Sequence, residues 1–163
     1  MEVIYIILGV LCLLAGLVLM FRPVIPASIA TYAAMWLFHL SYRITVAERT
    51  FIFWGAATFL LMTIARMKPK SEPESATANA YIALASLAGM LLAMTVSANV
   101  MLLGVLLGAV VGMIAFVNTP KGKFIGFSTS TFIHYFCSSG LPIAVAVSMV
   151  GIIIEGFLLN MAN

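Results

Sequence analysis

The sequence predicts an all-α protein, a polytopic transmembrane helical bundle with about seven membrane segments (six to seven). Of its 163 residues, 64% are hydrophobic and only 8% are charged, against roughly 45–50% and 25% in soluble domains. A soluble fold of this size could not hide so much apolar surface from water. The apolar runs are continuous and rich in Leu, Ala, Met and Gly, whereas a membrane barrel shows short segments of alternating polarity. Helices that cross a bilayer therefore account for the composition.

The N-terminal half, residues 1–66, contains three predicted spans, because a membrane helix needs roughly 20 apolar residues. No Lys or Arg precedes the first apolar run and no small-residue cleavage site follows it closely, so we interpret it as a retained span and not as a signal peptide. Pro23 and Pro26 end that helix, since proline lacks a backbone N–H and disfavours a helical residue before it. The three predicted spans are Val3–Phe21, Ala27–Tyr42 and Thr50–Ala65.

A polar loop at residues 67–79 combines prolines with mixed charge and separates the two halves. The glycine-rich C-terminal half, residues 80–163, contains four predicted spans. Residues 124–159 would be about 54 Å long as one helix, too long for one crossing. We therefore expect the Gly140-Leu141-Pro142 sequence to break this segment into two spans. The four predicted spans are Ala80–Val96, Asn99–Val117, Phe124–Ser139 and Pro142–Leu159.

The Lys and Arg residues are distributed unevenly over the connections between the predicted spans. If all seven segments cross, six of these eight residues fall on one side, and only Arg43 and Arg49 on the other. Cytoplasmic loops carry the excess of basic residues. We therefore expect a multi-pass protein of the bacterial cytoplasmic (inner) membrane, with its N-terminus outside and its C-terminus in the cytoplasm. Basic residues spread over loops do not form a nucleic-acid-binding patch, so we expect no nucleic acid partner.

Small residues recur at a spacing of four in two neighbouring spans, which places them on one face of each helix. Such faces let helix backbones approach closely, and we interpret them as helix-packing surfaces. Either the two stripes face each other, or they face another subunit; a glycine-lined pore is the functional alternative. The stripes consist of Gly104, Gly108 and Gly112 in the fifth span and Ala85, Gly89 and Ala93 in the fourth.

Polar side chains gather in the last two predicted spans. Ser130, His134 and Ser138 recur at a spacing of four, and Glu155 is the only acidic residue inside an apolar run. An ionisable residue in a span suggests a function, because a charge at the bilayer centre costs at least about 2.5 kcal/mol. These four residues are the candidates for a polar transport path. We favour a structural alternative, in which Glu155 reaches the headgroups and His134 bonds a neighbouring helix.

The sequence contains no recognisable catalytic or metal-binding motif. It has no Asp, its two Cys lie far apart inside apolar segments, and GxSxG, HExxH and P-loop patterns are absent. We therefore expect no enzymatic activity, no cofactor and no metal. The leading hypothesis is a non-enzymatic bundle, or an accessory component of a membrane assembly, that contacts membrane lipids and forms a homo-oligomer or part of a larger complex. The alternative is a small transporter or channel that uses the polar faces of the sixth and seventh spans.

The order of several features is typical of one group of membrane proteins. Gly9 and Gly16 lie in the first span, Pro23 and Pro26 follow it, and the glycine-rich run of the fifth span precedes a polar turn and Gly126. Over most of its length the chain thereby resembles the domain of unknown function 456 family, small bacterial glycine-zipper membrane proteins. The resemblance implies a helical, glycine-packed membrane protein and supplies no substrate or catalytic residue.

Overall fold

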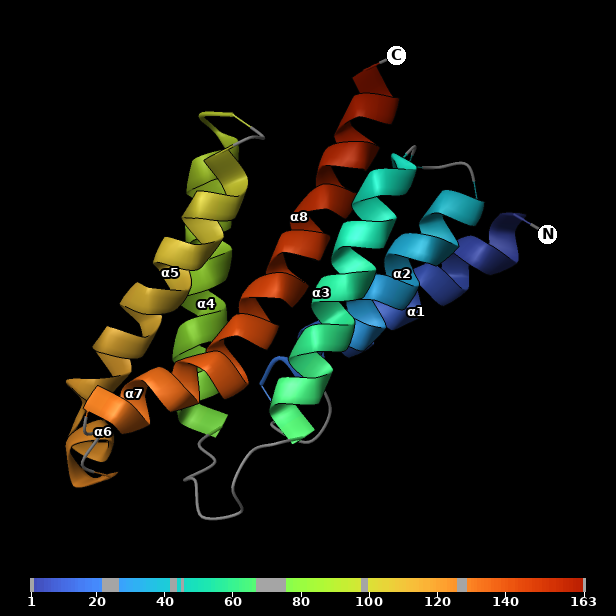
Figure 1. Cartoon of the computed structure of the whole chain (residues 1–163). Helices are drawn as coiled ribbons and strands as arrows, with labels where there is room; N and C mark the ends of the chain where they lie inside the picture. Colours follow the sequence, from blue (N-terminus) through green and yellow to red (C-terminus); the bar gives the residue numbers. More distant parts are fainter. Residues whose placement is uncertain are drawn as a thin grey trace.

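The computed structural model describes residues 2–21, 27–41, 44, 46–66, 76–97, 100–125 and 129–162, and every regular element in these ranges is a helix. The predicted all-α fold is confirmed for these ranges. Figure 1 shows two antiparallel helix pairs, α1–α2 and α4–α5, on either side of α8. The elements are α1 (Glu2–Leu19), α2 (Ala27–Leu40), α3 (Glu48–Arg66), α4 (Ala76–Met94), α5 (Met101–Val117), α6 (Pro120–Ile125), α7 (Thr129–Tyr135), the π-helical turn η2 (Phe136–Gly140) and α8 (Leu141–Ala162).

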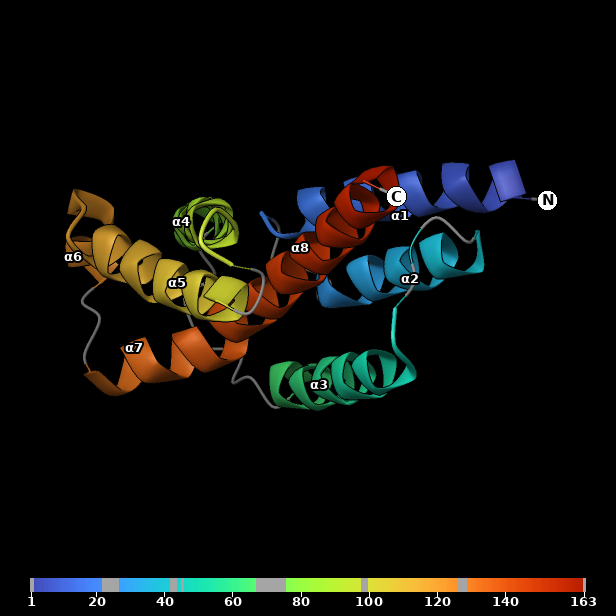
Figure 2. The same ribbon diagram turned by 90° about the horizontal axis from the view of Figure 1, so that it is seen from above.

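Two glycines bring α1 close to α2, which runs beside it in the opposite direction (Figure 2). A Cβ atom added at Gly16 would lie 2.6 Å from Cγ2 of Thr31, and one added at Gly9 would lie 3.0 Å from the Phe38 ring. Close approach of this kind is how small residues drive helix association where no water is displaced. A larger side chain at Gly16 would collide with Thr31, and one at Gly9 would require the Phe38 ring to move.

The α4–α5 pair is packed through the two small-residue stripes, which face each other within one chain. A Cβ atom added at Gly112 would lie 2.5 Å from the Tyr81 carbonyl oxygen and 2.9 Å from Cβ of Ala85. Cβ atoms added at Gly104 and Gly108 would collide with the Gly89 and Ala85 carbonyl oxygens, respectively. Of the two arrangements that the sequence allowed, the structure therefore has the stripes in contact with each other and not with a second subunit.

Thr119 makes the turn from α5 into the short helix α6. Its hydroxyl donates to the Phe116 carbonyl oxygen at 2.6 Å and accepts from the Gly122 N–H at 3.1 Å. A threonine cap followed by proline at the first helical position, here Pro120, is a favoured helix start, because proline has no N–H to satisfy. The basic residues of α6, Lys121 and Lys123, are exposed at this end of the bundle.

Helix α8 is the central element, since it contacts α2, α3, α4 and α5. Val147 is fully buried in a cluster with side chains of α4 and α5. Met149 is fully buried in a second cluster with side chains of α2 and α3. The two sides of α8 thus join the two helix pairs into one bundle, as Figure 2 shows from above.

The predicted break at Gly140-Leu141-Pro142 is wrong, because the chain stays helical from Thr129 to Ala162. An α-helical proline at position 142 would clash with the carbonyl four residues earlier, and it donates no hydrogen bond. The π-helical turn η2 avoids this problem: the Leu141 N–H bonds the Phe136 carbonyl, five residues back. The helix changes direction at this turn instead of ending there (Figure 1).

Three predicted boundaries also differ from the observed helices. Helix α4 begins at Ala76, so the last four residues of the predicted 67–79 loop are helical, while 67–75 lie outside the described ranges. Helix α3 begins at Glu48, two residues before the predicted span. The predicted sixth span, Phe124–Ser139, is divided between the end of α6, the whole of α7 and most of η2. Polar residues such as Glu48 and Asn79 lie inside helix ends, where a hydropathy pattern alone does not place them.

Two helices in the described ranges are long and apolar enough to cross a membrane, Ala76–Met94 and the continuous stretch Thr131–Met161. Three shorter helices are also apolar, Val3–Leu19, Ala27–Leu40 and Met101–Val117. Large apolar side chains cover much of the outer surface, and several are more than 70% exposed, including Ile52, Phe59 and Leu92. Apolar exposure on this scale is unusual for a protein surrounded by water.

Candidate functional site

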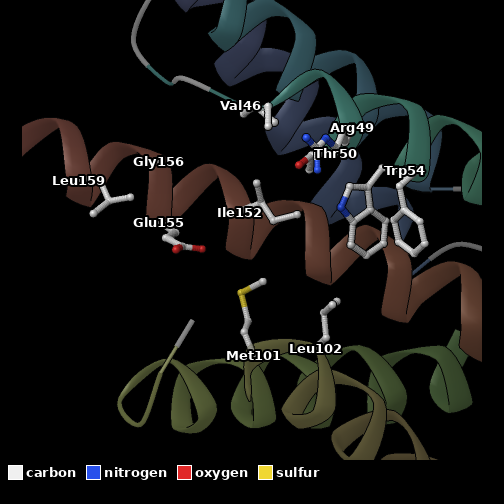
Figure 3. A pocket seen from close by; sticks show the side chains of 12 residues that line it. Val46, Arg49, Thr50, Trp54, Met101, Leu102, Ile152, Glu155, Gly156 and Leu159 are labelled. Atoms are coloured by element: carbon white, nitrogen blue, oxygen red, sulfur yellow. The ribbon is translucent and has the colours of Figure 1, made fainter. Parts of the chain in front are cut away.

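A pocket of about 480 Å³ lies where the beginning of α3, the beginning of α5 and the C-terminal half of α8 meet. Its volume falls within the roughly 300–1,000 Å³ of small-molecule sites. Figure 3 shows α8 crossing the view between α3 and the α4–α5 pair. Arg49, Thr50 and Trp54 form the α3 wall, Met101 belongs to the α5 wall, and Glu155 lies on α8.

The pocket contains one side chain of each charge. Arg49 is exposed and belongs to the first turn of α3, whereas Glu155 is half-buried on α8. The two charges come from different walls, and Figure 3 shows the Glu155 carboxylate on the side of α8 that faces Met101. A molecule in the pocket would therefore meet an anionic group and a cationic group at separate positions.

Both charged lining residues lie closer to the helix ends than the apolar residues Trp54 and Ile152. On α3, Arg49 and Thr50 belong to the first turn and Trp54 to the next one; on α8, Glu155 lies closer to the C-terminus than Ile152. By helix rise, Glu155 is about 10 Å from the end of α8 at Ala162. Both charged groups therefore lie toward the helix ends, where they share the lining with apolar residues such as Leu159, while Trp54 and Ile152 lie further into the bundle.

Hydrogen bonds and ring contacts to α2 hold the first turn of α3 and the residue Val46 before it, both of which belong to one wall of the pocket. The Tyr32 hydroxyl donates to the Phe51 carbonyl oxygen at 3.2 Å, and the Val46 N–H donates to Nδ1 of His39 at 3.5 Å. The Phe51 ring lies 4.5 Å from Trp36 and 5.0 Å from His39, measured between ring centroids. These contacts hold the first turn of α3, to which Arg49 belongs, against α2.

His134 and Glu155, the two ionisable candidates for a transport path, do not come together. His134 is exposed on α7, while Glu155 lines the pocket near the other end of the same continuous helix. The helix rise between them amounts to about 31 Å. Only Glu155 of the predicted polar path is therefore part of this pocket.

The two serines of the predicted path, Ser130 and Ser138, belong to different elements, and the structure describes the side chain of Ser138 alone. Ser138 is buried in η2, where its hydroxyl donates to the Tyr135 carbonyl oxygen at 3.3 Å. That bond is local and supports the wide helical turn. Ser130 belongs to α7, but its side chain lies outside the described residues.

A buried polar pair that the sequence did not single out connects α7 to α4. The Tyr135 hydroxyl donates to Oδ1 of Asn79 at 2.9 Å, and the exposed fractions of the two residues are only 1% and 2%. One signal in the sequence could have identified Asn79, because it continues the helical spacing of the buried residues Ile82, Ala83 and Ser86. The pairing with Tyr135 is not visible in any local pattern.

The fold and the pocket define an all-helical protein with two membrane-compatible helices and an amphipathic pocket at one end of the bundle. Among the described residues, no three His, Cys, Asp or Glu side chains are grouped so that they could hold a metal ion. No family model, curated protein or solved structure matches the chain. The resemblance to the domain of unknown function 456 family accordingly stays a prediction.

Proposed function

We propose that the chain is a multi-pass protein of the cytoplasmic membrane, whose helices form a non-enzymatic bundle that serves as a component of a larger membrane assembly. The observation that carries this proposal is the apolar outer surface. Exposed large side chains occur on both helix pairs and on α3, where Ile52 and Phe59 are 73% and 75% exposed. Lipid is the solvent that such a surface matches.

Six crossings fit the helices better than seven. Helix α8 has 22 residues, or about 33 Å, which matches a hydrocarbon core of about 30 Å without help from α7. Helix α7 then lies beyond the bend at η2, at the same end of the bundle as the basic helix α6 (Figure 1), and we place both at one membrane surface. Helices α1 to α5 supply the other five crossings, and the shorter ones are extended by interfacial residues at their ends.

With six crossings, both chain termini lie on the same side of the membrane. The pocket supports this arrangement, since it joins the beginnings of α3 and α5 to the C-terminal part of α8 at one end of the bundle. The connections at the opposite end carry most of the basic residues. The positive-inside rule then places the N-terminus and the C-terminus outside, so this proposal replaces the expected cytoplasmic C-terminus. The basic residues in those connections are Arg22, Arg66, Lys68, Lys70, Lys121 and Lys123.

A partner in the assembly would bind at a face other than the glycine stripe. Gly104, Gly108 and Gly112 are occupied by α4 of the same chain. The outer faces of α1 and α3 carry exposed apolar side chains, including Val3, Leu11 and Ile52. We place the contact with a second copy or another membrane protein on these faces.

Alkaline carbonate extraction of isolated membranes tests the proposal. An integral bundle stays in the membrane pellet, together with a multi-pass control protein, and it co-purifies in mild detergent with a second copy or with a partner protein. Release into the carbonate supernatant would refute the membrane assignment. A monomer without partners after mild chemical crosslinking would refute the assembly role.

A small transporter is the second candidate, and the pocket around Glu155 favours it. In that case substrate-dependent flux in proteoliposomes requires Glu155, and Glu155→Gln abolishes it. His134→Ala should leave the same flux close to the wild-type level, because His134 is exposed about 31 Å away along the helix. Equal flux in Glu155→Gln and the wild type would remove this candidate.

A further inference from the structure

The pocket between α3, α5 and α8 is built for an amphiphile with two opposite charges. We propose that it binds one bilayer phospholipid with a zwitterionic headgroup, such as phosphatidylethanolamine, whose ammonium group contacts Glu155 and whose phosphate contacts Arg49. This inference rests on the proposed membrane location of the chain. It adds a ligand and two contact residues that the bundle role does not require.

The two opposite charges in the pocket favour a zwitterionic ligand. Glu155 is half-buried and Arg49 projects from a different helix. An isolated charge near the hydrocarbon region is costly, and a partner of opposite sign lowers that cost. One zwitterionic headgroup provides both partners at once, whereas an anionic headgroup matches Arg49 and repels Glu155.

The apolar part of the pocket favours a ligand with an acyl chain. Behind the charged residues, Trp54 and Ile152 continue the wall toward the middle of the bundle. At the rim, the side chains of Phe53 and Leu159 are 62% and 60% exposed. Apolar residues exposed at the mouth of a pocket allow an acyl chain to enter from the surrounding lipid. A small soluble zwitterion would leave this surface uncovered.

The location of the pocket favours a lipid of one leaflet. Arg49 lies in the first turn of α3, and Glu155 lies about 10 Å from the C-terminal end of α8. In the six-crossing arrangement both residues therefore lie near the headgroup level of the same leaflet. A lipid in that leaflet can place its headgroup between the two charges and its chains along the inner wall.

Native mass spectrometry of the full chain in detergent tests the proposal, after carbonate extraction has established that the chain is integral. Phosphatidylethanolamine and phosphatidylglycerol with identical acyl chains are offered at equal concentrations. The wild type should bind the zwitterionic lipid about tenfold more tightly. This ratio of dissociation constants corresponds to the contribution of about one hydrogen bond to a charged group. Equal binding of the two lipids by the integral wild-type chain would overturn the lipid site and leave the bundle role intact.

Three variants assign the contacts. Glu155→Gln should remove the tenfold preference, and Arg49→Gln should weaken the binding of both lipids about tenfold. Glu48→Gln is the matched control, because Glu48 is exposed next to Arg49 and does not line the pocket; its lipid binding should equal that of the wild type. An unchanged preference in Glu155→Gln, or a loss in Glu48→Gln as large as in Glu155→Gln, would overturn the assignment.

The water-soluble headgroup, glycerophosphoethanolamine, separates a lipid from a soluble zwitterion. The proposal predicts that this compound does not displace the bound lipid at a thousandfold excess, because it cannot cover the apolar wall. Displacement at equal concentration would show that the pocket recognises a soluble molecule, and would overturn the assignment of a bilayer lipid.

Discussion

The hydroxyl of Tyr135 donates a hydrogen bond to Oδ1 of Asn79, 2.9 Å away, and both side chains are almost completely buried. The pair joins the helix before the π-helical turn to the first turns of α4, at sequence positions 56 residues apart. Buried polar groups are costly without partners and well satisfied with them. The orientation of α7 relative to α4 therefore depends on this contact.

Removal of the Tyr135 hydroxyl should destabilise the bundle. In Tyr135→Phe the Asn79 amide oxygen loses its partner, which costs about 1–3 kcal/mol. Asn79→Leu in the Tyr135→Phe background removes the unpaired group, so the double variant should recover part of the loss. Unfolding in detergent, monitored by circular dichroism, measures the free energy of unfolding of Tyr135→Phe, of Asn79→Leu alone and of the double variant. A loss in the double variant equal to the sum of the two single losses would show that the hydrogen bond does not couple these residues.

The α4–α5 contact should not tolerate a side chain at Gly108. A Cβ atom there collides with the Ala85 carbonyl oxygen and lies 2.9 Å from Cα of Ser86. Gly108→Leu should therefore lower the free energy of unfolding by about 1–3 kcal/mol, the usual cost of overpacking. Ala115→Leu on the same helix is the control, since Ala115 is exposed. The midpoint of thermal unfolding in detergent compares the two. Equal midpoints would contradict the close approach of α4 and α5.

The central position of α8 predicts a difference between two of its methionines. Met149 is fully buried against α2 and α3, whereas Met161 is 84% exposed. Met149→Ala should cost about 2 kcal/mol, the low end of the large-to-small range, because lipid in place of water removes part of the transfer contribution. Met161→Ala should change the free energy of unfolding by less than about 0.5 kcal/mol. Similar losses of unfolding free energy in the two variants would contradict the central position of α8.

Much of the helical architecture follows from local patterns. Continuous apolar runs predicted the helices, and spacing of four identified the small faces around Gly104, Gly108 and Gly112. The proline rule failed at Pro142, because it describes an α-helix and does not include a π-helical turn that accommodates the ring. The loop predicted from the prolines and mixed charge of residues 67–79 extends too far, because Asn79 lies in α4 and its side chain bonds Tyr135 in the interior.

The pocket could not be predicted from the sequence, since it depends on the number of crossings. Arg49 and Glu155 are far apart in the chain, and with seven crossings Arg49 and the C-terminus would lie on opposite sides of the membrane. The continuous helix through η2 brings the C-terminal half of α8 to the beginnings of α3 and α5. A hydropathy pattern identifies apolar segments, but it does not determine whether two neighbouring segments are one helix.

The most direct test of the six-crossing arrangement is to determine on which side of the membrane the C-terminus lies. In a variant without Cys12 and Cys137, single cysteines are introduced as Ser97→Cys, Asn163→Cys or Lys70→Cys, and intact cells are treated with a membrane-impermeant thiol reagent. Six crossings predict that the cysteines at 97 and 163 react from outside and that the cysteine at 70 reacts only after permeabilisation. Reaction of the cysteines at 97 and 163 from opposite sides would contradict the single crossing after α6, which α8 makes.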